Sequence, residues 1–163
     1  MKKGFTMIEL IFVIVILGIL ASVAIPRLAA TREDAEISAT VANLRTLLSD
    51  INSYYAVKDE FSEGADGVKW SEITNVYLEN ADSPVIGGTA RLMIGGERCI
   101  EVSINNRTDV LPAYITFTKY PRNKDKGVCK EVLEADAVKA FVDSKILDNL
   151  PGTMAIGSST TIY

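Results

Sequence analysis

The chain of 163 residues contains no histidine and only two cysteines. Without histidine the sequence cannot build a Ser-His catalytic arrangement, and it lacks the commonest general acid–base group and most types of zinc site. The sequence also lacks a Walker-type phosphate loop and the G-x-G-x-x-G fingerprint of dinucleotide-binding proteins. These absences argue against an enzyme and lead us to expect neither a cofactor nor a metal.

Basic side chains are also scarce relative to acidic ones. The sequence has 17 Lys and Arg against 21 Asp and Glu, which gives a formal net charge of -4. A broad nucleic-acid surface requires clustered Lys and Arg. The charge balance therefore argues against such a surface, without excluding a local basic patch.

The two cysteines, Cys99 and Cys129, are too few and too far apart to form a Cys-only metal site. They suit a single disulfide in an oxidising compartment. Such a bond would enclose 29 residues, which corresponds to about 3–4 kcal/mol in the chain-entropy account. A reduced pair of buried thiols is the alternative.

A long apolar run, residues 5–26, follows a short basic start and contains a single charged residue, Glu9. As a helix it would measure about 33 Å, enough to cross a bilayer core of about 30 Å. A secretory signal peptide has a shorter apolar stretch. A simple signal anchor has the right length but leaves the intramembrane carboxylate unexplained, because such a group is costly without a partner.

The segment around this carboxylate, Gly4-Phe5-Thr6-Met7-Ile8-Glu9-Leu10, resembles the prepilin cleavage site of type IV pilins and type II secretion pseudopilins. The resemblance implies cleavage between Gly4 and Phe5 by the prepilin peptidase, and N-methylation of Phe5. Met7 stands where leucine is usual. The resemblance covers roughly residues 1–57, and no motif of the remaining chain could be matched.

The resemblance also implies a role in assembly for Glu9 and for Thr6 of the same motif. Cleavage would create an amine at Phe5, and a carboxylate held in lipid could pair with the amine of a neighbouring subunit. Such a pair is strong where water is scarce, so it could set the register between subunits. The alternative is a carboxylate that reaches to the lipid headgroups without a partner.

Two residues of the apolar run are expected to weaken its helix. Pro26 removes a helix hydrogen bond, and Gly18 lowers helix propensity by about 1 kcal/mol relative to Ala. In pilins the residues that match these two bracket a segment that can unwind in the fibre. A simple kink without a function is the alternative.

Beyond the apolar run, residues 27–57 show apolar residues at alternating steps of three and four. We interpret them as one face of a helix that continues from the membrane segment and packs on a globular domain. A coiled-coil seam is the alternative. The residues of this stripe are Ile37, Val41, Leu44, Leu48, Ile51 and Tyr55.

Residues 58–163 predict a globular α+β domain. The expected architecture of the chain is a long N-terminal helix, first transmembrane and then amphipathic, that packs on a small antiparallel sheet, together with a second, C-terminal helix. Residues 58–89 read as irregular, and their acidic cluster lacks the spacing of a calcium loop. The expected elements are a short helix within Trp70–Glu79, strands at Ala90–Ile94, Arg98–Ile104 and Ala113–Lys119, a helix at Val128–Leu150, and a strand or extended tail at 153–163.

Together these patterns predict a leader at residues 1–4 and a structural subunit that polymerises into a type IV pilus or a type II secretion pseudopilus. The partners that the resemblance implies are the prepilin peptidase, other pilin-like subunits and an inner-membrane assembly platform. The chain would cross the inner membrane once, with its globular domain in the periplasm before assembly into a fibre. A membrane-tethered periplasmic binding domain that forms no fibre is the alternative.

Overall fold

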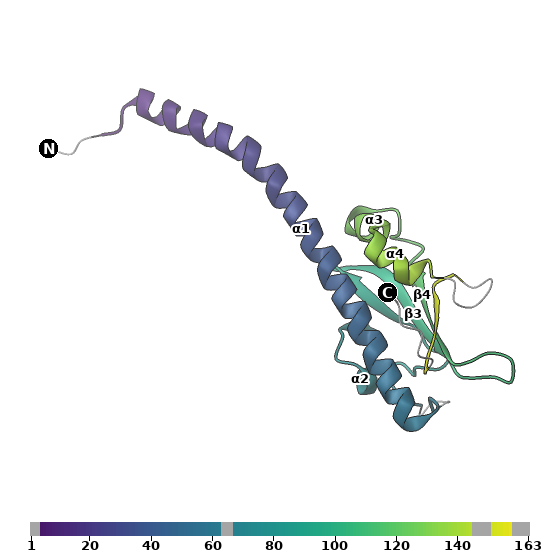
Figure 1. Cartoon of the computed structure of the whole chain (residues 1–163). Helices are drawn as coiled ribbons and strands as arrows, with labels where there is room; N and C mark the ends of the chain where they lie inside the picture. The colour runs from purple at the N-terminus through teal and green to yellow at the C-terminus, as the bar shows by residue number, and fades with distance from the viewer. Residues whose placement is uncertain (1–3, 63–66, 145–150, 158–163) are drawn as a thin grey trace. The chain divides into compact units, whose positions relative to one another are not determined.

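The structure of the chain, a computed structural model, describes residues 4–62, 67–144 and 151–157 (Figure 1). The chain divides into two compact units, Met1–Ala35 and Glu36–Tyr163. We refer to them as the N-terminal unit and the globular unit. In chain order the elements are α1 (Met7–Lys58), α2 (Trp70–Ile73), β1 (Leu78–Glu79), β2 (Ala90–Ile94), β3 (Glu97–Asn105), β4 (Tyr114–Lys119), α3 (Gly127–Glu134), α4 (Asp136–Val142) and β5 (Thr153–Ala155).

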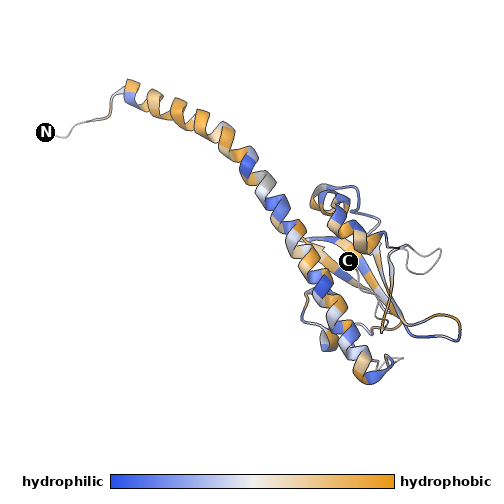
Figure 2. Cartoon of the chain, in the orientation of Figure 1, coloured by the Kyte–Doolittle hydropathy of each residue, from blue (hydrophilic) through white to orange (hydrophobic). Residues whose placement is uncertain are grey.

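In the N-terminal unit, helix α1 is free of charged residues from Leu10 to Pro26 and is apolar on all sides there. Figure 2 shows hydrophobic colour over most of the first part of the helix, with hydrophilic colour at its first turn. Its apolar segment is long and apolar enough to cross a membrane, by length and composition, and none of that segment is buried within the protein. The helix remains continuous through Pro26, so the proline lies inside it rather than at its end.

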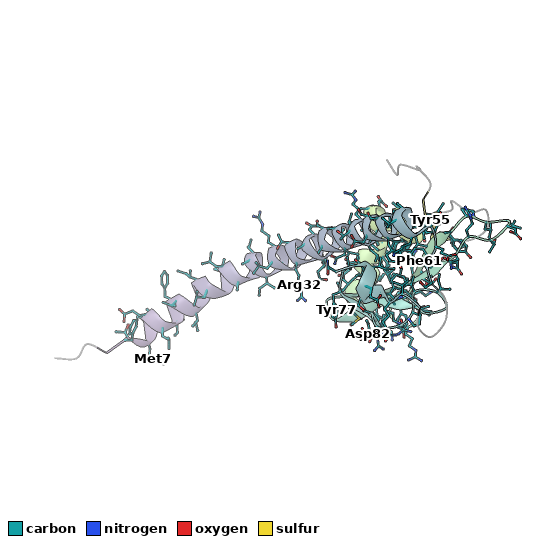
Figure 3. All side chains as sticks on the ribbon, turned by 90° about the horizontal axis from the view of Figure 1, so that it is seen from below. Met7, Arg32, Tyr55, Phe61, Tyr77 and Asp82 are labelled. Carbon is teal, nitrogen blue, oxygen red and sulfur yellow. A yellow bond between two sulfur atoms is a disulfide. The ribbon has the colours of Figure 1, made fainter. Side chains whose placement is uncertain are left out.

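Within the globular unit, α1 places one apolar face against the sheet. Leu44, Leu47 and Ile51 are fully buried, and Tyr55 lies against Phe61 with their ring centroids 5.6 Å apart (Figure 3). The remaining residues of the predicted stripe, Ile37, Val41 and Leu48, pack partly buried against the same core. The stripe is therefore the packing face of the globular unit, as expected, although the prediction omitted Leu47.

The sheet is an antiparallel meander with the strand order β1-β2-β3-β4-β5. Three strands match the predicted runs to within one residue at each end. The register shifts between Leu92 and Met93, which pair with Ile100 and Arg98, so Cys99 is the extra residue of a β-bulge. A bulge interrupts the alternation of a strand, and this explains why both Cys99 and Ile100 are fully buried.

The predicted C-terminal helix at Val128–Leu150 is wrong as a single element. The structure has two short helices, α3 and α4, separated at Ala135, whose backbone is extended with ψ at 130°. At about 100° per residue, Cys129 and Val138 would lie about 180° apart on one straight helix. Both are fully buried in the same core, so the helix has to be interrupted between them. Residues 145–150 of the predicted helix lie outside the described part.

Two other predicted elements are present and are shorter than the ranges given for them. The helix expected within Trp70–Glu79 ends at Ile73, because Thr74 is extended and its hydroxyl donates to Asp50 Oδ2 at 2.7 Å. The strand or extended tail expected at 153–163 begins as strand β5, which pairs with β4, and residues 158–163 lie outside the described part.

Candidate functional site

The predicted assembly residues lie at the start of α1: Thr6 directly precedes the helix, and Glu9 is in its first turn. The Thr6 backbone N–H donates to Glu9 Oε2 at 2.8 Å, and the Glu9 backbone N–H donates to Thr6 Oγ1 at 3.3 Å. This reciprocal pair is a capping box, in which an N-cap threonine and a glutamate three residues later satisfy free amides at a helix start. Thr6 is thus the N-cap residue of the helix and also donates the hydrogen bonds that orient the Glu9 carboxylate.

Only one of the two Glu9 carboxylate oxygens is used by this cap. Thr6 Oγ1 also donates to Glu9 Oε2, at 2.7 Å, so the same oxygen accepts two hydrogen bonds. Among residues 4–62, 67–144 and 151–157, no group donates to Glu9 Oε1. The Glu9 side chain is exposed. The carboxylate is therefore oriented by its own chain while one oxygen stays open to a donor from outside.

The predicted cleavage residues precede the helix. Phe5 is 87% exposed, and no atom lies within 4 Å of a Cβ added to Gly4. Neither residue belongs to a helix or a strand. The bond between them is consequently accessible in the chain as described.

Gly18 and Pro26 both lie inside α1, eight residues apart. A Cβ added to Gly18 would meet no atom within 4 Å outside the helix itself, so the structure shows no close contact that requires glycine there. Pro26 cannot donate the hydrogen bond that an ordinary residue would give to Ser22 O. Whether these residues allow local unwinding stays a prediction.

The predicted disulfide is confirmed. Cys99 and Cys129 are bonded, with their Cα atoms 5.1 Å apart. Both residues are fully buried. The bond links the bulge of β3 to the first turn of α3, so it attaches a short helix to the sheet at the place where hydrogen bonding in the sheet is irregular.

No group of three or more His, Cys, Asp or Glu residues that could hold a metal ion occurs in the described ranges. Part of the acidic cluster considered as a calcium site, residues 63–66, lies outside these ranges.

The sequence analysis missed an ion-pair network on the sheet. Glu79 of β1 contacts Arg91 of β2 at 3.5 Å and accepts a hydrogen bond from Arg98 Nε at 2.9 Å. The hydrogen bond from Arg98 holds the pKa of Glu79 below its usual range and raises the pKa of Arg98. Arg91 also pairs with Glu101 at 3.3 Å and lies over the Tyr120 ring.

The capping box, in contrast, could have been found in the sequence. Its signal is the spacing Thr-x-x-Glu directly before an apolar helix. The ion-pair network depends on strand register, which places Glu79 opposite Arg91 and Arg91 opposite Glu101. That register was not predicted.

Comparison with known protein families finds a match for the N-terminal motif. Residues 1–25 match the prokaryotic N-terminal methylation motif. The chain is 36% identical over 67 residues to the type IV major pilin protein PilA of Myxococcus xanthus, which covers 41% of this chain and 30% of that protein. It is 34% identical over 68 residues to the type II secretion system core protein G of Pectobacterium carotovorum, covering 42% of this chain and 44% of that protein.

A third relative is the type IV major pilin protein PilE of Neisseria gonorrhoeae, 34% identical over 88 residues, which covers 49% of this chain and 53% of that protein. The chain thus spans about a third to a half of the length of these relatives. No solved structure matches the chain significantly. The motif and these relatives confirm the resemblance: the N-terminal part of this chain is similar to the type IV pilins and the type II secretion pseudopilins.

Proposed function

We propose that this chain is a structural subunit that is anchored in the inner membrane by residues 5–26 and polymerises into a fibre of the type IV pilus or type II secretion kind. The observation that carries the proposal is the match of residues 1–25 to the N-terminal methylation motif. The relatives, which are a type IV major pilin and a type II secretion core protein, support the same class.

Processing is the first step of the proposal. The prepilin peptidase would cut between Gly4 and Phe5, and Phe5 would be N-methylated. The accessibility of both residues supports this, because a protease requires an extended and reachable bond. Gly4→Lys should block the cut, since a bulky charged side chain replaces a residue that has none. Intact mass of the membrane-purified protein measures it, and a wild-type chain that keeps Met1 in cells with active peptidase contradicts the assignment.

Assembly is the second step, and we propose that it depends on the carboxylate of Glu9. The amine that cleavage creates on a neighbouring subunit can donate to Glu9 Oε1, the carboxylate oxygen that the cap leaves open. Helices gain little by leaving lipid for one another, because both surroundings are apolar. A charge pair in a medium of low dielectric therefore supplies the direction and register that apolar packing lacks.

The test is the yield of sheared fibres. Glu9→Ala and Glu9→Gln should both leave insertion and cleavage intact, because removing a charge eases insertion. Both should abolish or cripple fibre assembly, and Gln isolates the loss of charge from the loss of shape. The matched control is Glu33→Gln, another exposed acidic residue of α1. Normal fibres from both Glu9 variants at wild-type subunit levels would show that the carboxylate is incidental.

The compartment of the globular unit follows from the same proposal. With residues 5–26 across the inner membrane, the globular unit lies in the periplasm, where the Cys99–Cys129 disulfide is stable. A thiol-blocking gel shift on rapidly quenched cells should detect no free thiol. Two free thiols under oxidising growth would contradict the topology.

A further inference from the structure

A concavity of about 810 Å³ lies on the globular unit, in the segment that connects α2 to β2. Its lining consists of Ser71 of α2 and residues 74–83, which include strand β1. The concavity is open to solvent, and its volume falls within the roughly 300–1,000 Å³ that is typical of small-molecule sites. All of the lining belongs to the globular unit, so its geometry does not depend on where the N-terminal unit lies.

The segment that forms the concavity is held in place by hydrogen bonds along its length. Thr74 Oγ1 donates to Asp50 Oδ2 of α1 at 2.7 Å, and Ser71 N donates to Ala81 O at 2.9 Å. Strand β1, in the middle of the segment, pairs with β2. A ligand would therefore meet a formed site, and binding to such a site loses less conformational entropy than binding to a flexible loop.

Tyr77 presents an aromatic ring at this concavity. It is 78% exposed, and it makes no ring contact with another aromatic residue of the described ranges. Figure 3 shows it at the same edge of the globular unit as Asp82, which is also a lining residue. The face of an aromatic ring carries negative charge density, so it attracts C–H groups of a ligand that packs on it. Tyr77 thus offers an unused apolar platform.

Polar side chains line the same concavity. Asn75, Asn80 and Asp82 are all exposed there. Each amide offers two N–H donors and an acceptor oxygen, and a carboxylate can accept from more than one hydroxyl. Within the described ranges the Asp82 carboxylate accepts one long hydrogen bond, from Ser71 Oγ at 3.4 Å, so most of its capacity is free. The concavity thus combines an apolar platform with several groups that can bind hydroxyls.

The charge of the concavity argues against an anionic ligand. None of the lining residues is basic, whereas Glu79 and Asp82 are acidic. Glu79 pairs with Arg91 and Arg98, and Arg91 also pairs with Glu101, so the two guanidinium groups are balanced by two carboxylates. Asp82 has no ion pair among the described residues and leaves the concavity negative. Phosphate groups, whether of nucleic acid or of lipid, would be repelled.

The composition of the lining argues against a protein partner and a metal ion. Asp, Glu, Ser and Ala are depleted at protein–protein interfaces, and the lining includes Asp82, Glu79, Ser71, Ser83 and Ala81. Of the aromatic types that are enriched at interfaces, the lining has only Tyr77. One free carboxylate is too few for Ca²⁺, which takes about six to eight oxygen ligands. The class that remains is a neutral molecule with hydroxyl groups and an apolar face.

We propose that this concavity binds a neutral oligosaccharide, with one pyranose ring stacked on Tyr77 and its hydroxyls bound by the surrounding amides and carboxylate. A pyranose with equatorial hydroxyls fits best, because both faces of its ring then present mainly C–H groups to the aromatic platform. Its hydroxyls lie at the ring edge and both donate and accept, which matches the amide groups of Asn75 and Asn80. The inference goes beyond the proposed function, since it requires neither membrane anchoring nor polymerisation.

Saturation-transfer NMR on the full chain, in micelles of a detergent without a sugar headgroup, tests the proposal. Cellotriose and triacetylchitotriose are neutral probes with equatorial hydroxyls. Cellotriuronic acid is the matched anionic probe, because it is cellotriose with a carboxylate on each ring. We expect saturation transfer to both neutral probes, strongest at the C–H protons of one ring, and about tenfold weaker binding of cellotriuronic acid.

Variants of two lining residues separate stacking from charge. Tyr77→Ala should weaken the binding of cellotriose about tenfold, whereas Tyr77→Phe keeps the ring and should bind like the wild type. Asp82→Asn should reduce the difference between cellotriose and cellotriuronic acid, because it removes the negative charge. The controls are Tyr114→Ala and Asp109→Asn, which change the same residue types outside the concavity and should leave binding unchanged.

Several results would overturn the inference. These are an absence of transfer to both neutral probes, equal binding of cellotriose by wild type and Tyr77→Ala, and tighter binding of cellotriuronic acid than of cellotriose. Self-association that Tyr77→Ala removes, without sugar binding, would assign the concavity to a second copy of this chain. Fibres without sugar binding overturn this inference alone, whereas sugar binding by a chain that forms no fibre overturns the proposed function alone.

Discussion

Helix α1 is one element of secondary structure in two different settings. Every side chain described between residues 4 and 35 is exposed, whereas Leu44, Leu47 and Ile51 farther along the same helix are fully buried. The first part is mostly apolar, and none of its described side chains is buried. The second part is apolar on one face, which the sheet covers. The apolar residues of the first part therefore do not form part of the protein core, whereas those of the second part do.

Removal of the disulfide should have the largest effect on the globular unit. Cys99→Ala with Cys129→Ala is expected to lower the free energy of unfolding by about 3–4 kcal/mol, because the unfolded chain regains the entropy of an open loop. Urea unfolding followed by the fluorescence of Trp70, the only tryptophan, measures it. Reduction of the wild-type protein should give a similar loss, and an unchanged midpoint in both would contradict the stabilising role.

Truncation of a leucine compares the two parts of α1 directly. Leu47→Ala leaves a cavity in the core and should cost about 3 kcal/mol of unfolding free energy. Leu17→Ala removes the same atoms from the exposed apolar segment and should leave the unfolding of the globular unit unchanged. The same urea titration in detergent tests both, and equal losses would show that the two parts of the helix are not distinct.

The capping box predicts a smaller effect, restricted to the helix start. Thr6→Val removes the hydroxyl that caps the Glu9 amide and should destabilise the first turn by about 1 kcal/mol. Hydrogen exchange at the amides of residues 6–9, in detergent micelles, should become faster, while exchange in the globular unit stays the same. Thr6→Ser keeps the hydroxyl and should exchange like the wild type.

The ion-pair network predicts the smallest effect, and it depends on pH. Arg98 holds the pKa of Glu79 below its usual range, so the stability it contributes is present above the ordinary glutamate pKa and is lost as the pH falls through the lowered value. Glu79→Gln should therefore be slightly less stable than the wild type at pH 7, and the difference should shrink at about pH 3.

Urea midpoints at the two pH values measure this difference. The control is Glu72→Gln, at an exposed position of α2 that has no ion pair among the described residues. A difference between Glu79→Gln and wild type that is the same at both pH values would contradict the role of the carboxylate charge.

Local sequence patterns were enough to predict many of the secondary-structure elements of the globular unit. Alternation located β3 and β4, because most of each strand has one buried and one more open face, and helical spacing located the packing face of α1. These patterns were not enough to predict that α3 and α4 are two separate helices. There, the apolar spacing permits one helix, and only the need to bury Cys129 and Val138 in the same core shows that it is broken.

The sequence by itself determined the N-terminal unit: its apolar helix, the motif from Gly4 to Leu10, and the Thr-x-x-Glu spacing of its cap. These features depend on residues that are close together in the chain, so they need no distant partner. Only the tertiary structure decided the bulge that buries Cys99, the interruption at Ala135 and the pairing of Glu79 with Arg98. The physical reason is that each depends on strand register or on a shared core, which brings together residues that are far apart in the chain.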